Sequence, residues 1–410
     1  MRAALALLAT SAILLAVPAA AQLLPGVGVP QLPVVGPVTQ GLAQTLDQPL
    51  QDIRQTARQL VEARADRIAD LLRQQREFIE PDADGQPAVR GELLLVDADA
   101  VTQTAARAAG FADAGSEQLA SLGMTVTRLQ VPRGMALAEA QRRLLSAAPN
   151  AELAPDNLHF QSGGATTLEA AAAASTAVPA IAIPVGVIDG APGKAETVSS
   201  QRGFARGAPL PSNHGSAVIS LLSGAGVRRV LAADVYGSDP AGGNALAIAR
   251  ALDWLAGNGA RVVSISLVGP KNTVLERAIM AVRGKGVVVV AAVGNDGPAA
   301  PPAYPASYPG VVAVTGVDGR QRSLIEAGRA LHLDYAAPGA DIRGRNKAGK
   351  WAGLRGTSYA VPLVAARVAA ALQRGGSWRE ALDAEAVDLG PKGPDGQYGR
   401  GLLCKRCGRR

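Results

Sequence analysis

A serine, a histidine, an aspartate and an asparagine stand in this chain at positions suited to acyl-transfer chemistry. Ser358 follows Gly356 and Thr357 and precedes an Ala-rich apolar run, 363–372, which predicts a buried helix. We expect Thr357 or Ser358 to cap this helix, with Pro362 in its first turn. A serine there lies beside N–H groups without helical partners, so it could attack a carbonyl while a donor holds the oxyanion. Gly-Thr-Ser alone would indicate a plain capping serine, and only the upstream residues favour catalysis.

Three upstream residues supply the other chemical groups. Asp189 ends the apolar run 183–188, where a lone carboxylate is costly unless it is paired. His214 opens a second apolar helix, and the chain has only three histidines, so a general base has few candidates. Asn295 follows the apolar run 287–292, from which its amide can point back into a cleft. Each residue alone also fits a helix cap, a loop or a turn.

The elements that position these residues begin at Ile181. Short apolar runs alternate with helical patterns, which predicts a parallel sheet covered by helices on both faces. Sites in such sheets form at the carboxyl ends of the strands. The expected strands are 183–188, 230–236, 262–267, 287–292 and 311–314, and the expected helices are 214–222, 245–258, 272–283 and the one after Ser358.

The motifs resemble those of the subtilisin-like serine proteases. The chain order Asp, His, Asn, Ser is that of the family, and residues 214–216, 291–295 and 356–362 are similar to its strongest motifs. The resemblance covers about 181–403 and implies an α/β fold with a subtilisin-like parallel sheet and helices on both faces. It also implies the catalytic residues Asp189, His214 and Ser358, with Asn295 in the oxyanion hole and no cofactor.

The same resemblance implies where polypeptide substrates bind. Ser266 and Leu267 lie in the segment similar to the edge strand that pairs with substrate backbone. Ala303 lies in the segment similar to the pocket for the side chain before the cut, and Gly294, in the motif 291–295, is a further expected substrate-binding residue. Val268 replaces a small glycine and narrows a subsite, and Ala303 makes the pocket shallower. We therefore expect small or medium apolar residues before the cut.

Two departures from the family pattern stand out. The family usually follows its aspartate with Ser or Thr, whereas Gly190 follows Asp189 here, so a supporting hydroxyl is absent. The segment after the helix at His214 is short and lacks the carboxylates of a calcium loop. We expect no metal site.

The N-terminal 21 residues predict a secretory signal peptide. Arg2 is followed by an apolar stretch and by the small residues 19–21 before Gln22. The alternative, an uncleaved membrane anchor, would need a longer apolar stretch. The signal peptide leads us to expect an exported protein, periplasmic or secreted. No later stretch is long and apolar enough to span a bilayer. Residues 22–80 read as a Pro/Gly-rich linker and an amphipathic helix, 46–79.

Residues 81–162 predict a small α+β module that resembles the family's inhibitory propeptide. We expect strands at 93–96, 124–131 and 150–160 and helices at 104–109, 116–122 and 136–147. The Ala/Gly/Thr-rich stretch 163–180 reads as an exposed linker that suits proteolysis. The chain's own N-terminal region is thus a predicted partner of a zymogen, with processing near 161–180.

The C-terminal tail, 404–410, is basic and contains Cys404 and Cys407, which we expect to form a local disulfide. The formal charge of +7 is otherwise spread along the chain, which argues against nucleic-acid binding.

Two function classes remain. The favoured hypothesis is an exported, autoprocessed serine endopeptidase. The rival is a protease-like fold that is catalytically silent and serves binding or assembly. A nucleotide-binding sheet is disfavoured because the chain lacks a glycine-rich phosphate motif.

Overall fold

The structure is a computed structural model, and it describes residues 38–162, 164–169, 178–405 and 407. The predicted signal peptide, 1–21, lies outside these residues. For residues 38–54 and 164–169 only the backbone is described. The chain divides into two compact units, Met1–Asp52 and Ile53–Arg410, and all contacts below lie in the second.

A seven-stranded parallel sheet forms the centre of the second unit, in the order β15-β14-β13-β11-β8-β10-β9. Its strands are short, and all except the edge strand β9 are largely buried because both faces are covered. The predicted parallel sheet is confirmed. The strands are β8 (Val185–Asp189), β9 (Ser200–Gly203), β10 (Val230–Asp234), β11 (Val262–Ile265), β13 (Val288–Ala292), β14 (Val312–Val317) and β15 (Tyr335–Pro338).

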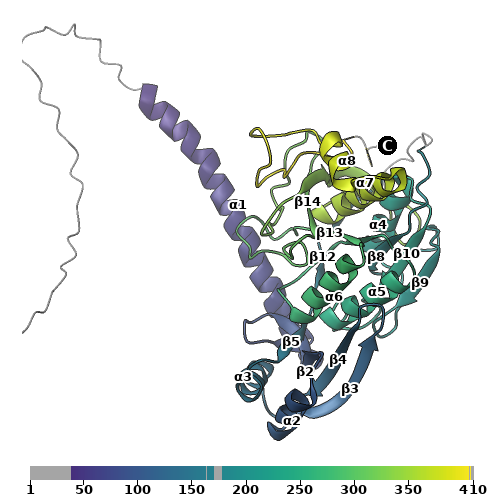
Figure 1. Cartoon of the computed structure of the whole chain (residues 1–410). Helices are drawn as coiled ribbons and strands as arrows, with labels where there is room; N and C mark the ends of the chain where they lie inside the picture. Colours follow the sequence, from purple (N-terminus) through teal and green to yellow (C-terminus); the bar gives the residue numbers. More distant parts are fainter. Residues whose placement is uncertain (1–37, 163, 170–177, 406, 408–410) are drawn as a thin grey trace, which may run out of the picture. The chain divides into compact units, whose positions relative to one another are not determined.

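Helices cover the two faces of this sheet (Figure 1). On one face, α4 (Asn213–Gly224) and α7 (Ala360–Arg374) share an apolar core with the strands. On the other, α5 (Ala245–Gly257) and α6 (Thr273–Gly284) lie side by side. A last helix, α8 (Trp378–Glu385), packs against α7.

The N-terminal module is an antiparallel sheet in the order β1-β2-β4-β3, with β5 beside β2. Its apolar residues, among them Leu94, Val126 and Ala154, belong to the same buried cluster as α5 and α6. The module therefore packs on the two helices that cover one face of the central sheet. Its elements are β1 (Ile79–Pro81), β2 (Pro87–Val96), α2 (Ala100–Ala108), β3 (Ala112–Leu119), β4 (Met124–Gln130), α3 (Leu137–Ala147) and β5 (Glu152–Asn157).

Several local predictions were wrong. The helix expected at 116–122 is strand β3, because its backbone pairs with β4 and the Ser116 and Thr127 hydroxyls hydrogen-bond at 2.8 Å. The stretch 163–180 is not a plain linker, since Gly164–Glu169 forms strand β7, which pairs with β17 (Trp351–Arg355). The predicted N-terminal helix is present, but its bounds differ: α1 spans Val38–Gln74 and not 46–79.

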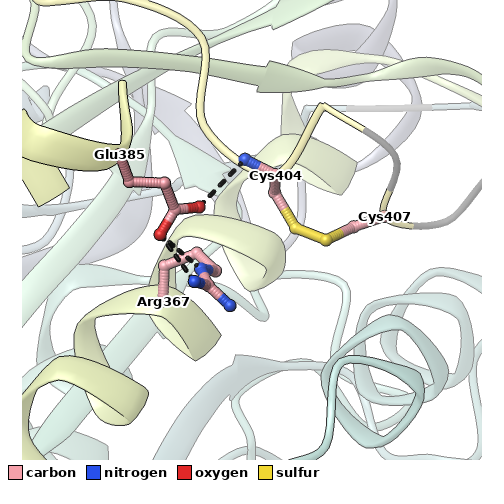
Figure 2. Close-up of a disulfide and its surroundings, with 4 residues drawn as sticks. All are labelled: Arg367, Glu385, Cys404 and Cys407. Carbon is pink, nitrogen blue, oxygen red and sulfur yellow. Dashed lines mark hydrogen bonds and ion pairs between the residues drawn. A yellow bond between two sulfur atoms is a disulfide. The ribbon is translucent and has the colours of Figure 1, made fainter. Parts of the chain in front are cut away.

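The two cysteines form a disulfide, Cys404–Cys407 (Figure 2). Next to it, the Glu385 carboxylate accepts hydrogen bonds from the Arg367 guanidinium and, at 3.4 Å, from the Cys404 backbone N–H. The disulfide and this carboxylate hold the start of the tail against α7 and α8. Within the described part of the chain, no helix is both long and apolar enough to cross a membrane.

Candidate active site

The structure brings Asp189 and His214 into direct contact. Asp189 is the last residue of β8, and His214 lies in the first turn of α4, whose N-cap is Ser212. The His214 Nδ1 and the Asp189 Oδ2 are 2.7 Å apart, and both side chains are buried. Because a carboxylate accepts, Nδ1 carries the proton and Nε2 is free to act as a base. The Nε2 atom is buried and has no hydrogen-bond partner among the described residues.

Ser358 lies in a 3-10 turn, η1 (Thr357–Tyr359), directly before α7. The expected capping role is wrong, because Tyr359 is the N-cap residue and no side chain caps the helix. The Thr357 hydroxyl instead donates to the Gly294 carbonyl at 3.2 Å. The Ser358 Oγ lies 3.1 Å from the Ser266 carbonyl oxygen and 2.7 Å from the Ser162 Oγ.

A carbonyl group from the N-terminal region lies between two donors of this site. The Ser162 carbonyl oxygen accepts from the Ser358 backbone N–H at 3.1 Å and from the Asn295 Nδ2 at 2.5 Å. The Asn295 Oδ1 accepts from the Thr357 N–H at 3.0 Å, which fixes the orientation of the amide. This is the arrangement that stabilises an oxyanion on an attacked carbonyl.

The residues before Ser162 bind as an added strand. Strand β6 (Phe160–Gln161) pairs antiparallel with β12 (Leu267–Val268), and the Ser162 N–H donates to the Ser266 carbonyl at 3.2 Å. Main-chain pairing of this kind holds a peptide in an extended conformation, whatever its side chains. The predicted binding residues Ser266 and Leu267 therefore contact the chain's own segment.

His159 directly precedes β6, and its backbone is hydrogen-bonded to Tyr236 and Gly243 rather than to β12. The His159 N–H donates to the Gly243 carbonyl at 2.8 Å, and the Tyr236 hydroxyl donates to the His159 carbonyl at 2.8 Å. Its imidazole is fully buried, with Nδ1 3.2 Å from the Asn157 carbonyl oxygen. Burial lowers the pKa of His159 to about 4, because desolvation disfavours the charged ring.

A cavity of about 1080 Å³ opens beside Ser162, and Gly294, Ala303 and Val268 contribute to its lining. A Cβ atom on Gly294 would lie 3.4 Å from the Val268 Cγ1 and 3.8 Å from the Ala303 Cβ. These three residues are therefore neighbours in the lining, with Gly294 at a φ of +89°. Because Gly294 has no side chain, the cavity has room for a substrate side chain between Val268 and Ala303.

The chain beyond Ser162 is paired as well. Strand β7 (Gly164–Glu169) adds to the hairpin of β16 (Ala340–Arg345) and β17, with Gly164 opposite Arg355. Because β17 leads directly into Gly356 and Ser358, backbone pairing positions the chain on both sides of the bond after Ser162.

Sequence reasoning missed Gln161 and Ser162. The feature that could have pointed to them is their position: residues 158–162 lie at the end of a strand candidate and directly before a Gly/Ala-rich stretch. It also missed Asp296, whose carboxylate pairs with Arg64 and Arg67 of α1 at 3.2 and 2.6 Å. Among the described residues, no group of three or more His, Cys, Asp or Glu side chains could hold a metal ion.

A solved structure with a similar fold is fervidolysin from Fervidobacterium pennivorans, a keratinolytic enzyme related to subtilisin. It superposes with a TM-score of 0.64 at 17% identity, over 80% of this chain and 61% of fervidolysin. At this identity the likeness concerns the fold, which is subtilisin-like.

Two of the sequence relatives are proteins of Lederbergia lenta. Subtilisin BL and Subtilisin Savinase are each 34% identical to this chain over 191 residues, which is 45% of this chain and 69% of each relative. The model of the Subtilase family (Peptidase_S8) matches residues 205–401, a range that contains His214, Asn295 and Ser358 but not Asp189. The chain belongs to the subtilase family of subtilisin-like serine proteases.

Proposed function

We propose that this protein is an exported serine endopeptidase that cleaves its own precursor between Ser162 and Gly163. The observation that carries the proposal is the position of the Ser162 carbonyl oxygen, which accepts hydrogen bonds from the Ser358 N–H and the Asn295 amide. The known subtilisin relatives are serine peptidases, which supports the reaction class.

The proposed reaction begins when the Ser358 Oγ attacks the Ser162 carbonyl carbon and His214 Nε2 takes the hydroxyl proton. Asp189 holds the Nδ1–H and stabilises the imidazolium that forms. The carbonyl oxygen gains negative charge between its two donors. His214 then gives the proton to the Gly163 nitrogen, the bond breaks, and Ser162 is left as an ester on Ser358.

Water then attacks this ester in the same way. His214 takes a proton from the water, and the oxyanion forms again between Ser358 N–H and Asn295. Collapse returns the proton to the Ser358 Oγ and leaves a carboxylic acid on Ser162, which loses its proton to water. The residues needed for both steps come from this chain, so the proposal requires no cofactor.

The N-terminal module acts in this proposal as an inhibitory propeptide. It packs on α5 and α6, and its last residues occupy the strand position beside β12. Substrates bind in the same extended manner once this segment has left. The signal peptide at 1–21 directs the precursor out of the cytoplasm, to the periplasm or beyond.

The test is mass spectrometry of the exported protein beside its Ser358→Ala variant. We expect a new N-terminus at Gly163 in the wild type and an uncut junction in the variant. A fluorophosphonate probe should label Ser358 in the cleaved protein and fail to label His214→Ala. A folded wild-type protein that is neither cut nor labelled would contradict the proposal and support a catalytically silent binding module.

A further inference from the structure

The Asp189 carboxylate has three hydrogen-bond donors, and one of them comes from outside the peptidase fold. Oδ2 accepts from His214 Nδ1, while Oδ1 accepts from the Gly190 N–H at 2.7 Å and from the Gln161 Nε2 at 3.1 Å. Asp189 itself is fully buried. A buried carboxylate depends on such donors both for its charge and for its orientation.

The space beside Asp189 explains why no side chain of the peptidase fold takes the place of the Gln161 amide as a donor to Oδ1. A Cβ atom on Gly190 would come within 2.4 Å of the Ser212 Oγ and within 2.8 Å of the Ser212 Cβ. Ser212 is the N-cap of α4, and its hydroxyl accepts from the Gly215 N–H at 2.9 Å. No hydroxyl-bearing side chain fits at residue 190 while Ser212 stands there.

The Gln161 amide lies close to the space that a side chain at residue 190 would occupy. The position of a Gly190 Cβ would lie 3.7 Å from the Gln161 Nε2. Of the two ends of the amide only the NH2 group can donate to a carboxylate, so the nitrogen and not the oxygen points at Asp189. Gln161 belongs to β6, and its carbonyl group precedes the residue whose bond is cut in the proposed reaction.

We propose that Gln161 is a positioning residue that completes the hydrogen bonds of Asp189, and that the enzyme prefers polypeptides with a side-chain amide at this position. This inference rests on the proposed function. Gln161 acts through Asp189, which in turn orients His214. Substrates with an apolar residue there leave Oδ1 with the Gly190 N–H as its one donor, so His214 is less well held.

Self-cleavage of the full chain tests the role of Gln161. Because the cleaved segment is part of the same chain, the rate does not depend on the association of a separate substrate. Gln161→Met keeps the length of the side chain and removes the donor. We expect the first-order rate of cleavage after Ser162 to fall about tenfold to hundredfold, the range for a hydrogen bond to a charged group. Gln118→Met, on the exposed side of β3, is the matched control and should cleave at the wild-type rate.

Gln161→Glu separates positioning from packing. The introduced carboxylate repels Asp189 when it is ionised, whereas its protonated form can donate a hydrogen bond to Asp189. We expect the rate of the variant relative to wild type to rise as the pH falls through the range in which a glutamate gains its proton. Gln161→Met carries no titratable group, so its rate relative to wild type should not change over the same range. A ratio for Gln161→Glu that does not change with pH would show that the group at 161 does not act through Asp189.

A swap of two residues provides an internal donor. Gly190→Ser combined with Ser212→Gly places a hydroxyl beside Asp189 and removes the clash. In this background Gln161→Met should cause no further loss of rate, because the two donors serve the same carboxylate. With peptides added in trans to the cleaved enzyme, kcat should favour Gln over Met at the same position.

The outcomes are distinguishable. A wild-type chain that is neither cut nor labelled at Ser358 contradicts the proposed function. A wild-type chain that is cut, with Gln161→Met cut at the same rate, overturns only this inference. An equal loss in the swapped background also overturns it. If circular dichroism shows that the swapped protein does not fold, the pH ratio of Gln161→Glu decides.

Discussion

At the scale of single residues, the proposed reaction centres on the carbonyl oxygen of Ser162 and the amide of Asn295. The amide is fixed at both ends, since Nδ2 donates to Ser162 and Oδ1 accepts from Thr357. Such a preorganised donor stabilises the charge that develops on the oxygen more than it stabilises the neutral carbonyl.

Asn295→Leu should therefore lower kcat about 100-fold to 1000-fold, with a much smaller change in KM. The reason is that leucine has a similar size but no N–H to offer the oxyanion. Steady-state kinetics on a peptide substrate measure both constants, and circular dichroism checks the fold. A variant with near-normal kcat would show that the Ser358 N–H is sufficient.

At the scale of elements, the position of the N-terminus of α4 depends on Gly215. A Cβ atom on Gly215 would lie 1.9 Å from the Gly190 carbonyl oxygen, so the helix and the turn after β8 are in direct backbone contact. This contact places His214 next to Asp189. The third position of the His-Gly-Ser motif also matters, because the Ser216 Oγ accepts from the Gly193 N–H at 2.9 Å.

We expect Gly215→Ala to displace α4, to cost about 1–3 kcal/mol of unfolding free energy and to abolish probe labelling at Ser358. The matched control is Gly224→Ala at the other end of α4, where a Cβ atom meets nothing within 4 Å. That substitution should keep labelling. Thermal unfolding and fluorophosphonate labelling measure the two effects, and full labelling of Gly215→Ala would contradict the close contact.

The part of α1 from 55 to 74 is a second attachment between the N-terminal region and the peptidase. Arg64 and Arg67 pair with Asp296, which follows Asn295, the proposed oxyanion donor. Arg64, Arg67 and Ile68 line the cavity beside Ser162. The helix therefore lies where it restricts access to the site after the proposed cut.

Removing the two arginines should speed the release of the cleaved N-terminal region. For Arg64→Gln with Arg67→Gln we expect the lag before peptidase activity to shorten about twofold to thirtyfold, because partly exposed ion pairs contribute about 0.2–1 kcal/mol each. The mature enzyme is the same in both proteins, so only release differs. The lag is read from a fluorogenic peptide assay at low salt.

Arg58→Gln with Arg76→Gln is the control, since it removes two exposed charges that flank the paired stretch of α1. It should leave the lag unchanged. Added salt should shorten the lag of the wild type and of this control but not that of the Arg64/Arg67 variant. Equal lags in all three proteins would show that α1 does not hold the cleaved region.

For the whole molecule, association of the module with the peptidase buries two titratable side chains. Asp156 accepts from the Leu246 N–H of α5 at 2.9 Å, and desolvation raises its pKa from 3.8 to about 8. Desolvation lowers the pKa of His159 from 6.5 to about 4. The complex therefore favours a protonated Asp156 and a neutral His159.

These shifts give the pH dependence of binding a direction. The contribution of Asp156 is complete below about pH 4 and is lost as the pH rises towards 8, whereas that of His159 is complete above about 6.5 and is lost as the pH falls towards 4. Between pH 6.5 and 8 only Asp156 changes, so the cleaved module should dissociate more readily as the pH rises.

Asp156→Asn should remove this slope, because its amide does not titrate. In the wild type the dissociation constant should rise by at most about tenfold per pH unit, the limit for one proton. Inhibition of peptide cleavage at about pH 6.5, 7.25 and 8 measures it across the range in which Asp156 changes charge. Equal slopes in the two proteins would show that Asp156 is not the titrating group. The control is Asp253→Asn in α5, whose carboxylate accepts from the Ser121 and Leu122 N–H groups of the module; it should keep the wild-type slope.

Part of this arrangement could be predicted from the sequence because it depends on local patterns. The apolar run 183–188 ending in Asp189 and the pattern after 213 indicate a strand and a helix wherever they lie. A parallel sheet brings the carboxyl ends of its strands to one edge, which is why Asp189 and Asn295 were expected near one another. The prediction of a helix at 116–122 was wrong because residues 116–119 pair with β4, and this tertiary pairing overrides the local preference of a short stretch.

The parallel sheet, the chain order of the chemical residues and the candidate triad can all be inferred from the amino-acid sequence alone. The backbone that lies against Ser358 became known only from the folded chain, because periodicity encodes the buried face of a strand but not the identity of its edge partner. Ser162 and Ser358 are 196 residues apart. The contacts of Gln161 with Asp189, and of Arg64 with Asp296, arise from the same docking of distant segments and have no local signal in the chain.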